Sequence, residues 1–567
     1  MVNEMMKPIG RVLATEKIPT TIDKFCFWTS EDLKLHAFDV VKVERSDGSL
    51  TFGVIENISH ITDAQSYLTN YISSDFGDAE LLEPTRRIGM NYVDAKVSFN
   101  NCGNETPVHN NDKVYLASKE EVIIALGLDK IQNPLTCGAI KMYAGTKNEI
   151  ELPVNLNGKF LLGPEGAHLN ISGISGLAAK TSYAMFLLKA VQDYEYGNPD
   201  EEQGTAFVIF NVKGKDLMAI DQENDFDFDE SEKERVKKEY LNLNMTPSPF
   251  SRVKYYIPYS SENSARQSTY LDKSDVSTYL DSGKLKKFKY TYEDDKESIE
   301  MMFSNVDDPQ QTMESIIAKI VDENDPDFKD LTTWNAFLEK VSEKSQKSSD
   351  NKSARDEISV LSWRKFKRIV KKAIADDMFA QRVNQIKKEC RLADEIKQIK
   401  KGDVLVIDIA KLDGDKQSYV FGDTLRTIYN LKLGEYDGEY NVAPPSKIVV
   451  FIDELNKYAG KDAPKQSPIL RGILDVTERG RSLGVVLFGV EQFRSDINSR
   501  VTGNCATHAY GRTNAIETSK GDYSSIPQTY KNMLTRLEQG EYLLQNPVFR
   551  SLLKIQFPKP IYKQFKN

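Results

Sequence analysis

The sequence predicts an α/β protein whose central sheet is mostly parallel, with a β-rich N-terminal part and an inserted helical subdomain. Segments such as TAFVIFNV (205–212) and KIVVFIDE (447–454) are continuously apolar, which is typical of strands covered on both faces. Residues 168–212 run strand, glycine loop, helix, strand, the order of a βαβ unit. Residues 1–150 instead hold short apolar segments separated by turn residues.

The composition is that of a globular protein. The chain has 567 residues, of which 40% are hydrophobic and 28% charged. Its net charge of −9 excludes a global positive field, so any contact with nucleic acid must be local. The five cysteines form no C-x-x-C pair, which predicts neither a disulfide framework nor a zinc site and favours a reducing cytosol.

No membrane segment is expected. No stretch approaches the ~18–20 apolar residues that span a bilayer, and the N-terminus lacks the apolar core of a signal peptide. We therefore expect a cytoplasmic protein.

Residues 1–150 are predicted to form a small barrel or sandwich. Asp47-Gly48 separates two alternating segments within 38–58, which indicates a hairpin. Further strand-like segments follow at 95–99, 112–116 and 141–145. A β-rich module without a site of its own is the simpler interpretation of this region.

The rest of the chain is predicted to form one core in two parts, 151–261 and 402–567, around a helical insertion at 262–401. Residues 221–234 are mostly acidic and predict a solvated loop or edge segment. A Lys/Ser/Asn-rich break at 343–356 interrupts the insertion.

A phosphate site is predicted between the strand HLNIS (168–172) and the following helix. Glycines let a backbone turn tightly and aim its N–H groups at a phosphate in front of a helix N-terminus. A lysine then neutralises phosphate charge, and the adjacent hydroxyl is a ligand for Mg²⁺. The candidate residues here are Gly173, Ser175, Gly176, Ala179, Lys180 and Thr181.

This loop departs from the pattern G-x-x-x-x-G-K-[ST]. Counted back from Lys180, the glycine positions are taken by Ile174 and Ala179. An ordinary strand-to-helix turn with a surface lysine is the alternative interpretation.

A second group of candidates ends a distant apolar strand. In KIVVFIDELNKY the strand finishes at Asp453-Glu454, and parallel sheets bind ligands at the carboxyl ends of their strands. We expect Asp453 to hold the Mg²⁺ shell and Glu454 to polarise the attacking water. Two acids at a helix start also stabilise its dipole without any catalytic role.

Polar and basic residues near later strands complete the predicted site. Gln492 follows the strand GVVLFGV, where it can sense a γ-phosphate or orient water. If subunits form a ring, one of Arg479, Arg481 and Arg512 could reach the ATP of a neighbour. Pairing with nearby carboxylates is the simpler interpretation for any single arginine.

Residues 363–401 are strongly basic within an acidic chain. Trp363, Phe366, Ile369, Val370 and Ala373 recur at helical spacing and predict one apolar helix face. The simpler interpretation is an amphipathic helix packed on the core. The alternative is a surface that contacts a phosphate backbone or a partner protein.

Together, these segments resemble the HerA-like branch of the FtsK/HerA P-loop ATPases. The resemblance rests on GISGLAAKTSYA, FVIFNVKGKDL, VLVIDIAKL, VVFIDELNKY, ERGRSLGVVLFGVEQ and AYGRT. It implies a RecA-like core, an N-terminal β-barrel assembly domain and a homo-hexameric ring with ATP at the subunit interfaces. Lys180 and Thr181 match the Walker A pair, Asp453 and Glu454 the Walker B pair.

The same resemblance assigns Gln492 as the sensor and Arg481 as the arginine that acts in trans. It implies an ATPase that uses ATP and Mg²⁺ and acts on double-stranded DNA with an effector nuclease or a Sir2-like partner, as in antiphage defence. The alternative is an assembly scaffold whose nucleotide state activates the partner enzyme. A dinucleotide-binding oxidoreductase is set aside, because the chain lacks a G-x-G-x-x-G turn.

Overall fold

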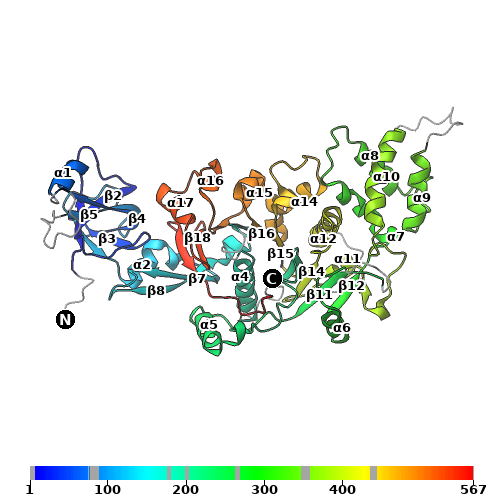
Figure 1. Ribbon diagram of the computed structural model, residues 1–567, viewed down its shortest axis with the longest axis horizontal. Helices are drawn as coiled ribbons and strands as arrows, with labels where there is room; N and C mark the ends of the chain where they lie inside the picture. Colours follow the sequence, from blue (N-terminus) through cyan, green and yellow to red (C-terminus); the bar gives the residue numbers. More distant parts are fainter. Residues whose placement is uncertain are drawn as a thin grey trace. The chain divides into compact units, whose positions relative to one another are not determined.

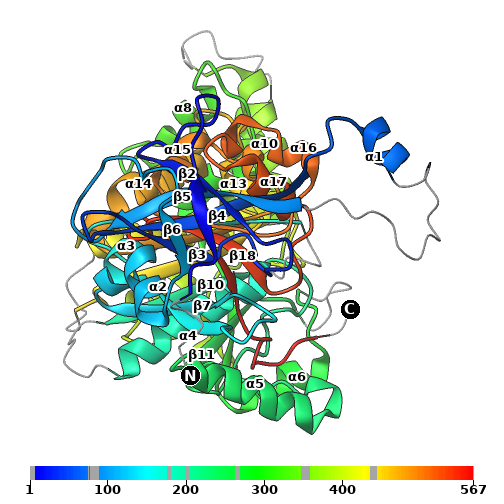
Figure 2. The same ribbon diagram turned by 90° about the vertical axis from the view of Figure 1, so that its left-hand side faces the viewer.

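The computed structural model describes residues 7–73, 76, 89–174, 180–197, 204–261, 268–346, 358–434 and 443–565 (Figures 1 and 2). Contacts divide the chain into two compact units. The first contains Met1–Asn157 and Tyr510–Phe557, and the second contains Gly158–Ala509 and Pro558–Asn567.

The first unit contains a closed six-stranded antiparallel barrel, which confirms the predicted N-terminal barrel. The predicted Asp47-Gly48 turn joins strands β3 (Val40–Glu44) and β4 (Leu50–Thr62). Gly48 has a φ of 82°, a conformation that favours glycine. Apolar side chains that include Phe25, Phe27 and Val41 fill the interior. In barrel order the strands are β1 (Gly10–Leu13), β2 (Lys24–Thr29), β5 (Gly89–Asn100), β4 (Leu50–Thr62), β3 (Val40–Glu44) and β6 (Lys113–Leu116).

The same unit contains a second antiparallel group of strands from both ends of the chain. Strand β7 (Pro134–Met142) pairs with β8 (Ile150–Asn157) and β19 (Leu553–Gln556), and β19 pairs with β18 (Glu541–Gln545). The sequence pattern assigns 402–567 to the core, whereas contacts group 510–557 with the N-terminal residues. The helices of this unit are α1 (Tyr67–Ser73), α2 (Lys119–Leu126), η3 (Leu128–Lys130), α16 (Ala515–Thr518), η8 (Gly521–Tyr523) and α17 (Gln528–Leu534).

The second unit is built on a parallel sheet, as predicted. Every residue of five of its strands is buried, in agreement with strands covered on both faces. Each of the first eight strands in the order below pairs in parallel with its neighbours among those eight. The order is β13 (Glu389–Cys390), β12 (Leu285–Phe288), β11 (Val253–Pro258), β14 (Val404–Asp408), β10 (Thr205–Asn211), β15 (Lys447–Asp453), β16 (Val485–Glu491), β9 (Leu169–Ser172) and β17 (Thr507–Tyr510).

Helices connect these strands. The acidic segment 221–234 is a loop only in part, because its last residues belong to helix α5 (Glu230–Asn242). Asp229 caps this helix and accepts hydrogen bonds from the backbone N–H groups of Ser231 and Glu232.

Among the described residues, no helix is long and apolar enough to cross a membrane. The α-helices are α3 (Gly158–Leu161), α4 (Lys180–Gly197), α5 (Glu230–Asn242), α6 (Lys273–Asp281), α7 (Tyr292–Asp295), α8 (Thr312–Val321), α9 (Trp334–Lys344), α10 (Val360–Ile374), α11 (Leu392–Lys397), α12 (Gly414–Leu433), α13 (Asn456–Ala459), α14 (Pro468–Leu483) and α15 (Ser499–Asn504). The 3₁₀ helices are η4 (Phe226–Phe228), η5 (Lys296–Phe303), η6 (Gln385–Lys387) and η7 (Arg494–Asp496).

The inserted segment is helical around α8, α9 and α10, which lie together in Figure 1, and it also supplies strands β12 and β13. The apolar face of α10 is buried as predicted, with Trp363 and Phe366 at 1% and 0% exposure. Their rings stack at 5.9 Å on Phe328 and at 5.0 Å on Phe303. This burial confirms the amphipathic helix.

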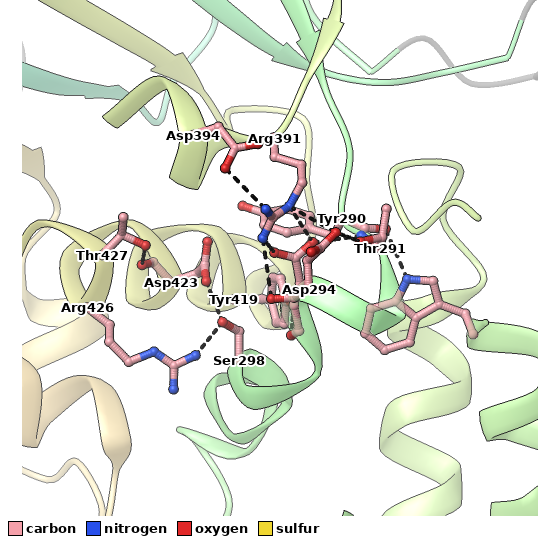
Figure 3. Close-up of polar contacts among 12 residues, drawn as sticks. Tyr290, Thr291, Asp294, Ser298, Arg391, Asp394, Tyr419, Asp423, Arg426 and Thr427 are labelled. Carbon is pink, nitrogen blue, oxygen red and sulfur yellow. Dashed lines mark hydrogen bonds and ion pairs between the residues drawn. The ribbon is translucent and has the colours of Figure 1, made fainter. Parts of the chain in front are cut away.

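A buried polar network joins α12 to the inserted segment (Figure 3). Ser298 donates a hydrogen bond to Asp423 and accepts one from Arg426. Arg391 donates to Asp295 at 2.7 Å and to an oxygen of Asp394 at 3.1 Å. Burial raises the pKa of Asp423. Asp295 is buried, so removing Arg391 would leave its charge uncompensated, and we expect Arg391 to be needed for stability.

Candidate nucleotide-binding site

The first part of the predicted site lies where β9 ends and α4 begins. Gly173 follows the strand, and its N–H donates to the carbonyl oxygen of Glu491 at 3.2 Å. Lys180 is the first residue of α4, where the helix dipole favours an anion, and it is only 6% exposed. Three further candidates lie outside the described residues: Ser175, Gly176 and Ala179.

The second part lies at the end of β15. Strand β16 separates β15 from β9, and the three strands are parallel, so their carboxyl ends share one edge of the sheet. The hydroxyl of Thr181 donates a hydrogen bond of 3.0 Å to Oδ2 of Asp453. Residues from the two predicted sequence motifs therefore meet.

The structure adds Lys213, which the sequence reasoning did not single out. It follows β10, the neighbour of β15, and its Nζ lies 2.9 Å from Oε1 of Glu454 and 3.7 Å from Oδ2 of Asp453. The signal was present in FNVKGKDL, where a lysine comes just after a strand's carboxyl end.

Glu454 is held in its ionised form. Burial raises the pKa of its carboxyl, but hydrogen bonds and charges from Lys457 and Lys213 outweigh burial, and the net pKa is lowered. The Glu454 backbone has a φ of 57°, in the left-handed region that costs energy for a non-glycine residue. Its N–H donates to Oδ1 of Asp453 at 2.8 Å. The two acids are thus fixed relative to each other.

Glu491, the last residue of β16, is the second residue that sequence reasoning missed. It is fully buried, and within the described part of the chain no group donates a well-aligned hydrogen bond to either carboxylate oxygen. Burial raises its pKa to about 8, although Asn170 and the charges of Arg494 and Lys180 oppose the shift. The neighbouring Gln492, the predicted sensor, is exposed.

Lys180 lies among the acids of this site. Burial lowers the pKa of its ammonium, and the charges of Asp453, Glu491 and Glu454 oppose that shift. The pKa of Lys180 therefore depends on acidic residues at the carboxyl ends of both β15 and β16.

The predicted arginines lie elsewhere. Arg479 and Arg481 are exposed near the end of α14, and Nη1 of Arg481 donates to the carbonyl oxygen of Glu165 at 3.2 Å. Strand β16 begins just after α14 and has seven residues, so its two ends are about 20 Å apart. Arg481 therefore lies near the opposite edge of the sheet from Lys180. Arg512 is half-buried and belongs to the first unit.

The oxygen atoms of this site fit a magnesium ion. Mg²⁺ prefers hard oxygen ligands and is usually bound by one or two protein groups together with phosphate and water. The Thr181 hydroxyl and the Asp453 carboxylate, 3.0 Å apart, are such a pair. No group of three or more His, Cys, Asp or Glu side chains suited to a metal occurs in the part of the chain that the structure describes.

Comparison with solved structures finds likenesses at low sequence identity. No protein-family model and no curated protein sequence matches the chain. The bacterial conjugative coupling protein TrwB has a TM-score of 0.40 and 10% identity over 73% of this chain and 90% of its own. VirB4 of Thermoanaerobacter pseudethanolicus has a TM-score of 0.40 and 10% identity over 75% of this chain and 95% of its own.

A third structure is the genome packaging NTPase B204 from Sulfolobus turreted icosahedral virus 2 in complex with ATP-gammaS. Its TM-score is 0.22, with 17% identity over 30% of this chain and 72% of its own. At these scores the likenesses carry no information on what this chain binds.

Proposed function

We propose that the chain binds magnesium ATP at the carboxyl edge of the second unit's sheet and hydrolyses it. The observation that carries this proposal is the 3.0 Å hydrogen bond between Thr181 and Asp453, beside the buried Lys180. A lysine and a hydroxyl at a helix start, next to an acidic strand end, supply the groups that a metal-bound triphosphate needs.

Each residue has a distinct part in this mechanism. Lys180 neutralises phosphate charge at the positive end of α4, and Gly173 begins the loop whose residues Ser175, Gly176 and Ala179 would cradle the phosphates. Thr181 and Asp453 would hold Mg²⁺, which supplies charge neutralisation at the phosphate oxygens when bound.

Hydrolysis needs a group that orients water. Glu454 remains ionised because Lys213 and Lys457 pair with it, so it can accept a hydrogen bond from the attacking water. Lys213 also holds this carboxylate next to Asp453. In this proposal, Gln492 senses the γ-phosphate from the exposed end of the same edge.

We further propose a homo-hexameric ring in which Arg481 completes the site of a neighbouring subunit. Arg481 comes just before β16, whose seven residues separate its two ends by about 20 Å. Its place near the opposite edge of the sheet from Lys180 supports action in trans. Arg479 and Arg512 are alternatives for the same role. The ring would act on double-stranded DNA with an effector nuclease or Sir2-like partner in antiphage defence.

A scaffold whose nucleotide state activates the partner enzyme is the second candidate function. The departure of the glycine loop from the usual spacing favours it, since slow turnover suffices for a scaffold. Turnover stimulated by duplex DNA without a partner would select the motor. Turnover that requires the partner would select the scaffold.

Titration calorimetry with magnesium ATP, together with phosphate release, tests the ATP site. Lys180→Met should abolish both signals, because it removes the buried cation at the helix start. Lys238→Met, which changes an exposed lysine on α5, is the matched control and should behave as the wild type. Equal ATP affinity in wild type and Lys180→Met would overturn the proposal.

A further inference from the structure

A basic groove is lined mostly by α10. Figure 1 shows this helix apart from α4, whose first residue is Lys180. Its volume is about 670 Å³, and among the described residues its lining contains no acidic side chain. Five basic side chains line it: Arg364, Lys367, Arg368, Lys371 and Lys372. An adjoining groove of about 450 Å³ shares Lys367 and Lys371 and continues toward Glu339 and Glu343 on α9.

Much of this positive charge is not compensated within the described residues. Arg364 donates from Nε to the carbonyl oxygen of Ser345 at 3.0 Å, and Lys367 reaches the hydroxyl of Ser345 at 3.5 Å. Lys372 forms an ion pair with Asp415 at 3.3 Å. For Arg368 and Lys371, the described part of the chain offers neither a hydrogen bond nor an ion pair.

The arrangement of these charges costs stability. Arg364 and Arg368, Arg368 and Lys372, and Lys367 and Lys371 are like charges four residues apart on a helix, and such pairs are destabilising by about 0.2–0.5 kcal/mol each. The helix dipole favours Lys371 and Lys372 in the last turn, but it does not act on Arg364, Lys367 and Arg368 farther from that end. The row therefore indicates a ligand that provides the opposite charge.

The helix that carries the row is firmly anchored. Its other face buries Trp363, Phe366 and Val370 in the core of the unit. From Arg364 to Lys371 the helix rises about 10 Å. Successive phosphates on one strand of DNA are about 3.4 Å apart along the helix axis, so the row spans roughly three of them.

We propose that this groove binds the sugar-phosphate backbone of a nucleic acid. Charge complementarity selects this ligand, because the groove presents a linear row of cations that matches a linear row of phosphates. No base-reading geometry is implied, so binding is independent of sequence. The inference deepens the proposed function by assigning the place where DNA contacts the chain, and it does not depend on ATP hydrolysis.

Fluorescence anisotropy with a labelled duplex of random sequence tests the proposal on the full chain. The wild type should bind, with affinity that falls steeply between about 50 and 200 mM salt. Arg368→Gln combined with Lys371→Gln should weaken binding about tenfold or more and make the salt dependence shallower. Arg235→Gln combined with Lys238→Gln on the exposed face of α5 is the matched control and should leave binding unchanged.

Two further measurements keep the result interpretable. Arg368→Lys combined with Lys371→Arg keeps the charges and should restore binding, which separates charge from folding. The affinity of each variant for magnesium ATP should equal that of the wild type, so a failure at the ATP site is seen separately.

Three outcomes would overturn the proposal, whatever happens to ATP turnover. The first is a wild type that does not bind duplex. The second is unchanged affinity in the double glutamine variant. The third is competition by polyglutamate as strong as that by unlabelled duplex, which would indicate an acidic protein partner.

Discussion

The side chains of Thr181 and Asp453 lie 272 positions apart in the chain and are joined by a hydrogen bond of 3.0 Å. Parallel pairing of β16 with both β9 and β15 produces this meeting, since it brings the carboxyl ends of the strands to one edge. The bond places a hydroxyl oxygen next to a carboxylate, so both groups can contribute oxygen ligands to one metal ion.

Removing the Thr181 hydroxyl should weaken the binding of magnesium ATP. Thr181→Val keeps the shape of the side chain and deletes the oxygen, so we expect affinity in the presence of Mg²⁺ to fall at least about tenfold. Thr181→Ser keeps the oxygen and should bind within a few-fold of the wild type. Calorimetry with and without Mg²⁺ measures both. Equal affinity for valine and serine variants would show that the hydroxyl is not a metal ligand.

Glu454→Gln should separate ATP binding from ATP cleavage. The amide keeps the size of the side chain but cannot accept a proton from water, so we expect ATP to bind with unchanged affinity while kcat falls about 10²–10⁴-fold. Phosphate release under single-turnover conditions measures the chemical step. Normal turnover in this variant would refute the role given to Glu454.

Lys213→Met should move the acid limb of the kcat–pH profile to higher pH. Lys213 is one of two lysines whose pairing lowers the pKa of Glu454, so its loss raises that pKa. A carboxylate that must be ionised to act then loses activity at a higher pH. Lys215→Met, two residues along and paired with Asp272, is the control. Identical acid limbs in Lys213→Met and the wild type would contradict the prediction.

The sequence carried the pattern of this site but not all its members. Lys180, Thr181, Asp453 and Glu454 stand in recognisable positions relative to strands, and the structure brings them together. Lys213 follows a strand without any repeated pattern, so only the pairing of β10 with β15 reveals it.

Glu491 was missed for a different physical reason. Strand β16 is covered on both faces and its other residues are apolar or glycine, so the pattern gives no sign that a carboxylate is buried at its last position. Gln492 was singled out because it is a polar residue that follows the strand GVVLFGV, where it can sense a γ-phosphate or orient water. The structure nevertheless buries Glu491 and exposes Gln492.

In the fold, too, local sequence patterns predicted individual strands and turns but not the pairing of distant segments. Apolar segments predicted β9, β10, β14, β15 and β16 of the parallel sheet, whereas β11, β12 and β13 were not predicted. Asp47-Gly48 predicted a barrel hairpin. The grouping of β18 and β19 with β7 was not predictable, since it joins segments roughly 400 residues apart that carry no mark of their partner.

Phe366→Ala should destabilise the inserted helices. The ring is fully buried and stacks on Phe303, so its loss creates a cavity that costs about 3–5 kcal/mol. Ile369→Ala, on the partly buried side of α10, is the matched control and should cost clearly less. Urea unfolding measures both free energies. Equal losses would show that the stack does not anchor this helix.

Glu491→Gln should change how stability depends on pH. Burial raises the pKa of the Glu491 carboxyl from 4.5 to about 8, so the folded protein keeps this proton where the unfolded chain has released it. The folded state then binds more protons than the unfolded state between about pH 4.5 and 8, and this group's contribution to stability falls as the pH rises through that window. Glutamine cannot titrate and removes this contribution. The Tm of the variant minus that of the wild type should therefore increase steadily from pH 5 to pH 8. Glu323→Gln, at an exposed glutamate, should give a flat difference over the same range. A flat difference for Glu491→Gln as well would mean that Glu491 is ionised in the folded protein, paired with the charge of Lys180.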